Sequence, residues 1–379
     1  MAFTGPSVKN LGADFAIETG RAARTHWSEV IGRFSDANIF QTWSYEAVRS
    51  GPENVTHLQV KRGGRVVAAA QVRMIRIPCL GQKVAYVRWG PLWQLRGEEP
   101  EAEVFRQVVR ALHREYVARR GMVIRLVPHL GEVEGEIYRT VLREEGYVEQ
   151  HRRPRYRTII MDIRPPLEEL NRGLHQKWRN CLNVARKRNL EVVEGEHDEM
   201  FEEFESIYQE MLDRKQFSSD VEPAQFRQIQ QDLPLSEKMR VVLCRTEGQV
   251  CAGAICSALG ATGLYLLGAT SNSGMKSNGS YLAQWKVIEW LKLQGCSGYN
   301  LHGINPVQNE GTYRFKSRLA GASGRDLCFL GQFDAYPSRT VQWLVANAER
   351  MRAALKGARE LARAPRSLRR GEPKSMDAA

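Results

Sequence analysis

The sequence has few cysteines, and their placement argues against two common ways of stabilising a fold. Seven cysteines are scattered along 379 residues, an odd number with no Cys-x-x-Cys pair. A disulfide framework or a structural zinc site needs closely spaced sets, so we expect neither disulfides nor a metal. Cys251 and Cys256 lie in an apolar run, where a thiol acts as a small hydrophobic group. No motif of the known cysteine nucleophiles is present, so cysteine catalysis is not expected.

Long apolar runs are also missing. No segment approaches the roughly 20 apolar residues that a membrane-spanning helix needs. Residues 1–18 are polar and mixed, without the basic-then-apolar pattern of a signal peptide, so we expect a cytoplasmic protein. The composition, 42% hydrophobic and 26% charged, is typical of a globular protein. Because 379 residues exceed the usual size of a single core, two domains are expected.

Acidic residues are in deficit. The chain has 55 Lys and Arg against 43 Asp and Glu, which gives a formal net charge of +12. Such a charge favours a polyanionic partner, which is RNA, an anionic membrane surface or a phosphorylated substrate. A solvated basic surface would account for the same charge without any partner.

The most basic stretch has the periodicity of an amphipathic helix. Leu174, Trp178, Leu182 and Ala185 recur at helical spacing and should face the core. Five cations then project outward as candidates for phosphate contacts with a nucleic acid, namely Lys177, Arg179, Arg186, Lys187 and Arg188. Residues 151–157 add further arginines and a tyrosine just upstream. The charge pattern alone does not separate this reading from a solvated helix face.

The order of expected elements is similar in the two halves of the chain. In the first half we expect helices at 21–32, 40–48 and 101–119 and strands at 56–60, 65–76, 84–87 and 122–127. In the second half we expect helices within 167–188 and at 200–215 and 280–294, and strands at 156–163, 191–193, 239–245, 251–259, 264–269 and 298–301. Two copies of one mixed α/β unit follow from this order. A helix from 338 to about 364 precedes a basic, flexible tail at 365–379.

The junction between a strand and a helix bears on whether the chain binds coenzyme A. Acetyltransferases of the GNAT type hold the pyrophosphate of coenzyme A on a [QR]-x-x-G-x-[GA] turn at a helix N-terminus. The best candidate in the second half, residues 276–281, fails at both ends of this pattern. Residues 94–99 in the first half fail at the last position, where Glu99 would lie beside the phosphates. We therefore expect neither half to bind coenzyme A in the usual way, and we expect no cofactor.

Several motifs in order resemble one family. The strand Tyr299-Asn300-Leu301-His302-Gly303, followed after a gap by Phe315-Lys316, is similar to the Tyr-Asp-φ-x-Gly strand and Phe-Lys pair of the FemA/FemB/FemX non-ribosomal peptidyltransferases. Four other segments look like elements of that family, namely Gln41-Thr42-Trp43, the stretch 86–91, the basic helix 177–191 and Met211-Leu212-Asp213-Arg214. The long helical arm of the FemA subgroup has no counterpart here, so the chain resembles the shorter, FemX-like form.

The chain departs from the family pattern at a few positions. A lysine that follows the early Trp in FemX-like enzymes has no counterpart, because Tyr45 and Ala47 occupy the expected positions. Asn300 replaces the usual Asp, and Leu267 stands where some members have a second Tyr after Tyr265. These differences leave the acceptor-phosphate contact of the first half open.

The resemblance implies a fold and a reaction. The fold is α/β (α+β), with two tandem GNAT-like domains, each a mixed sheet flanked by helices. They span residues 1–155, completed by 330–364, and residues 156–329. The implied reaction joins an amino acid from aminoacyl-tRNA to an amine of a phosphorylated peptidoglycan precursor, lipid-linked or UDP-linked. An enzyme working on such a precursor is expected in the cytoplasm, with peripheral contact at the inner face of the membrane.

The resemblance also implies site residues. Lys316 would stabilise the oxyanion that develops on the ester carbonyl or hold the terminal phosphate of the tRNA. Phe315 would stack on the terminal adenine, although a core position is the ordinary reading of a lone aromatic. His302 and Glu310 are the nearby candidates for a base. Substrate contacts are expected from Arg214, Tyr265, Tyr299, Asn300, Gly303 and Tyr313.

Two other functions remain open at this point. One is an acyl-CoA-dependent N-acyltransferase with the same double fold, acting on a sugar or exopolysaccharide precursor. The other is a non-catalytic RNA-binding protein, which would account for the charge but not for the Tyr-x-x-x-Gly and Phe-Lys elements. The donor discriminates between them, because charged tRNA, acyl-CoA or neither would support product formation.

Overall fold

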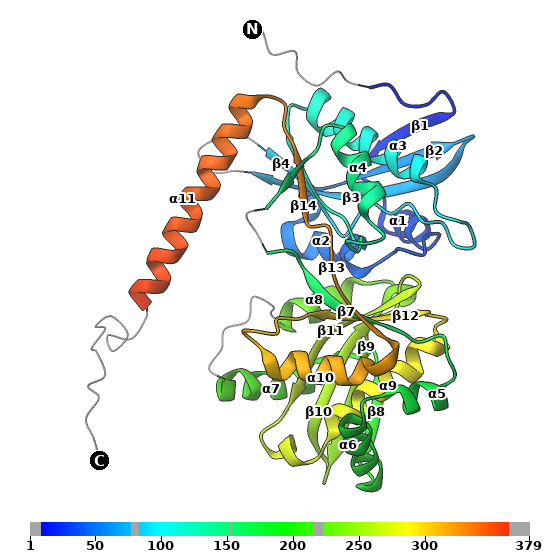
Figure 1. Ribbon diagram of the computed structural model, residues 1–379, viewed down its shortest axis with the longest axis vertical. Helices are drawn as coiled ribbons and strands as arrows, with labels where there is room; N and C mark the ends of the chain where they lie inside the picture. The colour runs from blue at the N-terminus through cyan, green and yellow to red at the C-terminus, as the bar shows by residue number, and fades with distance from the viewer. Residues whose placement is uncertain (1–8, 77–82, 152–153, 216–222, 364–379) are drawn as a thin grey trace.

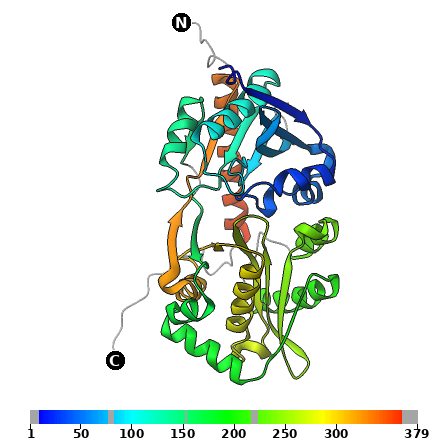
Figure 2. The same ribbon diagram turned by 90° about the vertical axis from the view of Figure 1, so that its right-hand side faces the viewer.

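The computed structural model of the protein describes residues 9–76, 83–151, 154–215 and 223–363. The expected tail at 365–379 lies outside these residues, as do Cys79 and the two arginines at 152 and 153. The described strands form two mixed seven-stranded sheets, one in each half of the molecule. Figure 1 shows the two halves one above the other, each with helices packed on its sheet, and Figure 2 shows the same arrangement from the side.

The first sheet belongs mainly to the N-terminal half. Its strand order is β1 (Phe15–Gly20), β2 (Val55–Arg62), β3 (Arg65–Arg76), β4 (Lys83–Arg88), β5 (Val123–Val127), β14 (Gln332–Ala335) and β6 (Val148–Gln150). β4 and β5 run parallel, and the other neighbouring strands are antiparallel. β3 begins and ends at the residues that the sequence predicts, because Gly63-Gly64 makes the turn before it.

The second sheet has the same pattern. Its strand order is β13 (Gly324–Cys328), β7 (Arg157–Asp162), β12 (Gly298–Gly303), β11 (Thr262–Thr270), β10 (Gln249–Ser257), β9 (Arg240–Thr246) and β8 (Glu191–Gly195). β11 and β12 are the parallel pair. The parallel pair therefore has the same place in both sheets, and the expectation of two similar mixed α/β halves is confirmed.

One strand from the end of the chain returns to the sheet of the first half. β14 comes after the second half in the sequence, yet it lies between β5 and β6 of the first sheet. The division of the chain into residues 1–155 with 330–364 and residues 156–329 stays a prediction. The arrangement ties the ends of both halves together and leads the chain into the last helix.

The helices follow the sequence prediction in most places. They are α1 (Arg24–Ile31), α2 (Trp43–Ser50), α3 (Ala102–Leu112), α4 (Glu136–Glu144), α5 (Leu167–Gly173), α6 (Gln176–Lys187), α7 (Asp198–Lys215), α8 (Pro223–Asp232), α9 (Gly279–Leu293), α10 (Glu310–Ala320) and α11 (Arg339–Arg363). The predicted helix at 101–119 is α3 followed by a π-helical segment, His113–Arg119. Short 3-10 turns lie at Ile39–Gln41, Pro52–Asn54, Leu235–Glu237, Ser273–Lys276 and Gly321–Ser323.

Some elements were not expected from the sequence. They are β1, β6, β13, β14, α4, α8 and α10. β6, β13 and β14 have three to five residues, too few for a clear alternation of apolar and polar residues. These short strands are stabilised by long-range pairing with their neighbours, which a local pattern does not record.

A shared core joins the two halves. Phe40, Tyr45 and Trp89 of the first half pack in one apolar cluster with residues of α7, α8 and β11, including Phe204 and Phe226. Backbone contact is direct as well, because the N–H of Ala261 donates to the carbonyl of Ser35 at 2.6 Å. The halves are therefore held in one arrangement by buried apolar surface.

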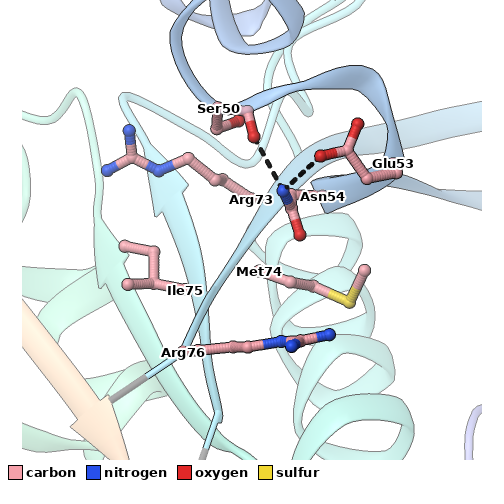
Figure 3. A pocket seen from close by; sticks show the side chains of 7 residues that line it. All are labelled: Ser50, Glu53, Asn54, Arg73, Met74, Ile75 and Arg76. Carbon is pink, nitrogen blue, oxygen red and sulfur yellow. Dashed lines mark hydrogen bonds between the residues drawn. The ribbon is translucent and has the colours of Figure 1, made fainter. Parts of the chain in front are cut away.

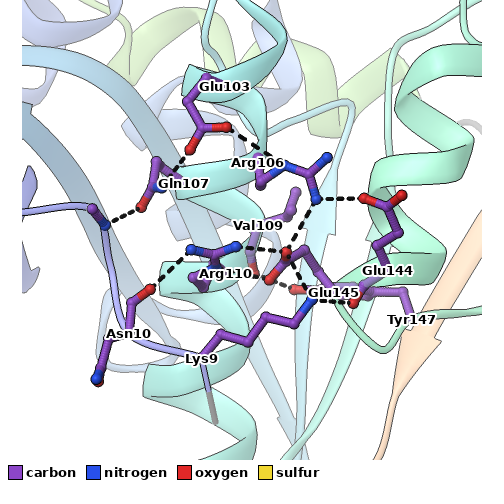
Figure 4. Close-up of polar contacts among 11 residues, drawn as sticks. Lys9, Asn10, Glu103, Arg106, Gln107, Val109, Arg110, Glu144, Glu145 and Tyr147 are labelled. Atoms are coloured by element: carbon purple, nitrogen blue, oxygen red, sulfur yellow. Dashed lines mark hydrogen bonds and ion pairs between the residues drawn. The ribbon is translucent and has the colours of Figure 1, made fainter. Parts of the chain in front are cut away.

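A buried carboxylate ties the outer edge of the first half together (Figure 4). The Glu145 side chain is 2% exposed and accepts hydrogen bonds from Arg110 at 2.8 and 2.9 Å and from Arg106 at 3.3 Å. Lys9 lies 3.4 Å from the same carboxylate. Burial acts to raise the pKa of Glu145, but the hydrogen bonds and charges of these cations lower it overall, so the group stays ionised.

The last helix leaves the body of the protein. At its start, Val345 packs against Val84 and Val123, and Glu349 pairs with Arg125 at 2.7 Å. Figure 1 shows α11 running beside the molecule, and on this helix Trp343 and Met351 are 65% and 64% exposed. Across the described ranges, no helix is long and apolar enough to cross a membrane.

Candidate active site

The parallel strands of the second half separate at one end. β11 and β12 pair only from Thr262 to Leu264, opposite Gly298 to Asn300. Beyond that point β11 continues to Thr270 and β12 to Gly303 without pairing to each other. Lys316 of α10 lies between the separated strand ends, because its Nζ is near Tyr265 of β11 and bonds to Gly303 at the end of β12.

Lys316 is the most unusual group in this region. Its side chain is buried, with 7% of the residue exposed, and Nζ lies 5.3 Å from the ring centroid of Tyr265 on β11. Nζ donates to the carbonyl of Gly303 at 2.9 Å and approaches that of His302 at 3.5 Å. No carboxylate lies within ion-pair distance of it in the described part of the chain. Burial lowers the pKa of Lys316 to about 7, so both protonation states are populated near neutral pH.

His302 lies next to this ammonium in an unusual backbone conformation. Its φ is +64°, in the left-handed region, and its ring is half-buried between the two halves, 6.0 Å from Trp89 and 5.4 Å from Tyr156. Burial, together with the positive charges of Lys316 and Arg88, lowers the pKa of His302 to about 3. The imidazole is therefore neutral at physiological pH and a weak base.

Two of the expected substrate-binding residues lie beneath this region. Tyr299 is fully buried, and its hydroxyl donates to Oε1 of Gln284 on α9 at 2.8 Å. Asn300 is 1% exposed and bonds to Thr158 and to the backbone of His302. Neither side chain is accessible to a ligand in this structure, so we place both of them in support of the site.

The side chains of Phe315 and Lys316 point in different directions and have different neighbours. Phe315 is half-buried, and its ring lies 5.2 Å from Tyr281 and 6.0 Å from Trp178. It therefore faces α9 and α6, while Lys316 faces the ends of β11 and β12. Tyr313 is half-buried against the same core cluster as Phe315. Adenine stacking by Phe315 stays a prediction, and its aromatic neighbours favour the core reading that the residue type alone gives.

The remaining expected contacts lie at the strand ends. Gly303 closes β12, where a side chain would lie 3.3 Å from the ring of Tyr156. Arg214, at the end of α7, donates to the carbonyl of Thr270 at 2.9 Å and to the side chain of Asn272. Glu310 is exposed at the start of α10 and pairs with Arg314, so it does not face Lys316.

The first half brings cations that the sequence analysis missed. Arg88 stacks on Phe40 at 4.1 Å and donates to the hydroxyl of Tyr45 at 3.0 Å. Arg49 donates to the same hydroxyl at 3.1 Å. Positive charge is thus present beside Tyr45, where the resemblance expected a lysine. The signal was available only in part, because Arg49 follows Tyr45 by one helical turn, whereas Arg88 comes from a different strand.

The basic helix α6 has the expected inner face. Trp178, Leu182 and Ala185 of α6 are buried in the core of the second half, as is Leu174, which lies before the helix in an extended conformation. Of the five cations, Lys177, Arg186, Lys187 and Arg188 are exposed and Arg179 is half-exposed. Some have local partners, since Arg186 lies 5.3 Å from the ring of Trp285 and Arg188 donates to the carbonyl of Lys276 at 2.5 Å.

A cavity in the first half lies apart from these residues (Figure 3). Its volume is about 690 Å³, and it is lined by Ser50, Glu53, Asn54, Arg73, Met74, Ile75 and Arg76. None of the residues expected at the site contributes to it. Among the described residues no cluster of His, Cys, Asp or Glu has the geometry to hold a metal ion.

The comparisons with known proteins agree with the fold. Residues 235–350, which include Lys316, match the FemAB family. The structure of FemX superposes with a TM-score of 0.74 at 14% identity, covering 86% of this chain and 99% of that one. A protein of unknown function from Bacteroides thetaiotaomicron VPI-5482 gives a TM-score of 0.56 at 10% identity, with 85% and 99% covered. The C-terminal DUF2156 domain of a protein from Agrobacterium fabrum gives 0.51 at 11% identity, with 85% and 96% covered.

No protein of curated function matches the sequence itself. Residues 235–350 therefore carry the similarity to the FemAB family, and the chain shares its fold with FemX.

Proposed function

We propose that this protein is an aminoacyltransferase that acts on a cell-envelope precursor and takes its amino acid from aminoacyl-tRNA. The acceptor in this proposal is an amine of a peptidoglycan precursor, lipid-linked or UDP-linked. The observation that carries it is Lys316, a buried amine at the separated ends of β11 and β12, for which the described residues supply no carboxylate partner. The positive charge of its ammonium form is therefore not neutralised by an ion pair among those residues, as expected of a group that acts on a substrate.

The proposed reaction needs little chemical help. The acceptor nitrogen attacks the ester carbonyl carbon, a C–N bond forms, and the bond from carbon to the ribose oxygen of the tRNA breaks. The proton lost by the nitrogen goes to the departing ribose oxygen. Because the ester is already activated, the protein has to orient the two substrates and stabilise the oxyanion of the tetrahedral intermediate. Lys316 supplies the positive charge for the second task.

The pKa of Lys316 makes this role dependent on pH. With a pKa of about 7, the ammonium form is lost as the pH rises through neutrality. His302, with a pKa of about 3, is too weak a base to hold the proton of the acceptor amine. We therefore do not propose His302 as the general base. In this proposal His302 forms part of the wall of the site.

The partners in this proposal are anionic. Five cations at α6 would bind tRNA phosphates, namely Lys177, Arg179, Arg186 and Lys187 on the helix and Arg188 directly after it. Peripheral contact with the inner membrane face is supported by α11, which exposes Trp343 and Met351 and carries six Lys and Arg against two Glu between residues 339 and 363. Sedimentation with anionic vesicles checks this contact, and it should weaken in Trp343→Ser.

An acyl-CoA donor is the second candidate function. Besides the sequence mismatch, the loop before α9 satisfies its own amides, since Gly279 N–H donates to Ser277 Oγ at 2.9 Å and Gly274 N–H to Ser271 Oγ at 3.0 Å. Fewer N–H groups are then free for a pyrophosphate. This local bonding favours the tRNA reading.

The deciding experiment supplies one donor at a time. Purified protein is incubated with an amine acceptor and either aminoacyl-tRNA or acetyl-CoA, and the product is followed by mass spectrometry. We expect product only with aminoacyl-tRNA and no binding of acetyl-CoA by calorimetry. A micromolar dissociation constant for acetyl-CoA with acetylated product would replace the proposal by the second candidate.

A further inference from the structure

The end of β12 turns sharply at three residues, and one buried side chain organises the turn. Oδ1 of Asn300 accepts from the backbone N–H of His302 at 2.9 Å and from the hydroxyl of Thr158 at 2.6 Å. Its Nδ2 lies 3.4 Å from Nε2 of His129. Asn300 is 1% exposed, so its side-chain amide forms its hydrogen bonds within the protein.

The bond from Asn300 to His302 explains the backbone around it. The N–H of His302 is turned toward its own chain, and the residue adopts a φ of +64°, which is rare for a residue with a side chain. The antiparallel pairing of β12 with β7 shifts its register between Asn300 and Gly303 as a consequence. A side chain that accepts from the N–H two residues later is a known way to hold such a turn.

The turn determines what Lys316 contacts. Because the backbone bends at His302, the carbonyls of His302 and Gly303 both approach Nζ of Lys316, at 3.5 and 2.9 Å. These are the hydrogen-bond acceptors that the structure gives this buried ammonium. Without the turn, the carbonyls would continue the alternating directions of a strand and would not converge.

We propose that Asn300 is a positioning residue, which holds the turn at His302 and Gly303 so that their carbonyls fix Lys316 at the separated strand ends. The consequence for catalysis rests on the proposed function, whereas the effect on Lys316 itself does not. Asn300 acts through the backbone and does not touch the substrate.

The amide also keeps negative charge away from Lys316. The groups around this position come from several elements, namely Tyr265 of β11, His302 of β12, Arg88 of β4 and His129 after β5. All of these are neutral or positive at neutral pH. An aspartate at position 300 would accept the same two hydrogen bonds and would add a carboxylate, which favours the ammonium form of Lys316. Asn300 thus sets both the position and the protonation of Lys316.

Asn300→Asp tests the proposal with a readout that does not need activity. The Cε resonance of Lys316 is followed by ¹³C NMR as the pH is raised, and Lys316→Met identifies the signal. We expect the midpoint of this titration to rise by about one pH unit or more in Asn300→Asp. Asn309→Asp is the matched control, because Asn309 caps α10 through the N–H of Thr312 at 3.2 Å and is exposed. Its titration should stay unchanged.

Two further variants keep the test decisive if Asn300→Asp folds poorly. Thr158→Val keeps the shape of the side chain and removes the hydroxyl that donates to Asn300. It should move the Lys316 midpoint less than Asn300→Asp does. Asn300→Leu removes the acceptor, and its kcat should fall about tenfold or more, because the oriented cation is lost, with little change in KM. An unchanged Lys316 midpoint in Asn300→Asp, with normal kcat in Asn300→Leu, overturns the proposal. A different outcome is that Lys316→Met is fully active and the Lys316 midpoint still shifts in Asn300→Asp. In that case the proposed function fails and the positioning role of Asn300 stands.

Discussion

At the scale of single residues, the protein places Lys316, an amine whose pKa is lowered to about 7, where two strands separate. Lys316→Met keeps an unbranched apolar stem of similar length and removes the charge. If the ammonium stabilises the oxyanion, kcat should fall about 10²–10³-fold with little change in the acceptor KM. Steady-state kinetics with aminoacyl-tRNA measure this. A kcat within threefold of the wild type would remove Lys316 from the mechanism.

Lys316→Met should also change the stability of the protein. Measuring its thermal unfolding tests this change and confirms that the variant folds. The pKa of Lys316 is about 7 in the folded protein and near 10.5 when unfolded, so between these values the unfolded state binds more protons. Burying the ammonium therefore costs most below pH 7, and this cost disappears as the pH approaches 10.5. Lys316→Met should raise the Tm at pH 6, and the difference should shrink toward pH 10.

The pH profile of activity separates two roles of this amine. If the ammonium form is required, kcat should fall as the pH rises through about 7. Lys316→Arg should remove this fall, because a guanidinium stays protonated, although its planar shape lowers the absolute rate. Activity that rises through pH 7 would instead identify neutral Lys316 as a base.

At the scale of elements, α6 is the candidate surface for tRNA. Lys177 and Lys187 are exposed on it, and the double variant Lys177→Glu with Lys187→Glu should weaken tRNA binding. If each contacts a phosphate, the slope of log K against log salt should become shallower by about 2. Filter binding at several salt concentrations gives this slope.

The control for the α6 variant reverses two charges at exposed positions outside α6. Arg33 and Arg114 are exposed on the first half, so Arg33→Glu with Arg114→Glu alters the net charge equally. This control should keep a near-normal slope. Equal losses in both double variants would mean that overall charge, and not α6, attracts the tRNA.

At the scale of the whole molecule, the site depends on how the two halves are joined, because Lys316 belongs to one half and Arg88 to the other. Gly260 lies at this joint, where a Cβ would overlap the carbonyls of Ser35 and Ala37. Gly260→Ala should destabilise the protein by about 1–3 kcal/mol and lower its activity. Chemical unfolding and kinetics check both, and Gly20→Ala, where a Cβ meets nothing within 4 Å, should be near neutral. Equal stability of the two variants would contradict this account.

The amino-acid sequence by itself determined the features that depend on local pattern. The buried face of α6, the ends of β3, the repeat of one α/β unit and the location of Lys316 after a Tyr-x-x-x-Gly strand follow from spacing between near neighbours. Local periodicity is sufficient there, because apolar residues at helical or alternating spacing must share one face.

Only the tertiary structure decided which side chains meet. It separated Phe315 from Lys316, although they are adjacent in sequence, because successive residues of a helix point about 100° apart. It also buried Tyr299 and Asn300, inserted β14 between β5 and β6, and brought Arg88 near His302. These outcomes depend on contacts between segments far apart in the chain, and on the burial they create. The lowered pKa of Lys316 is of the same kind, since desolvation arises only when α10 packs this side chain against the ends of β11 and β12.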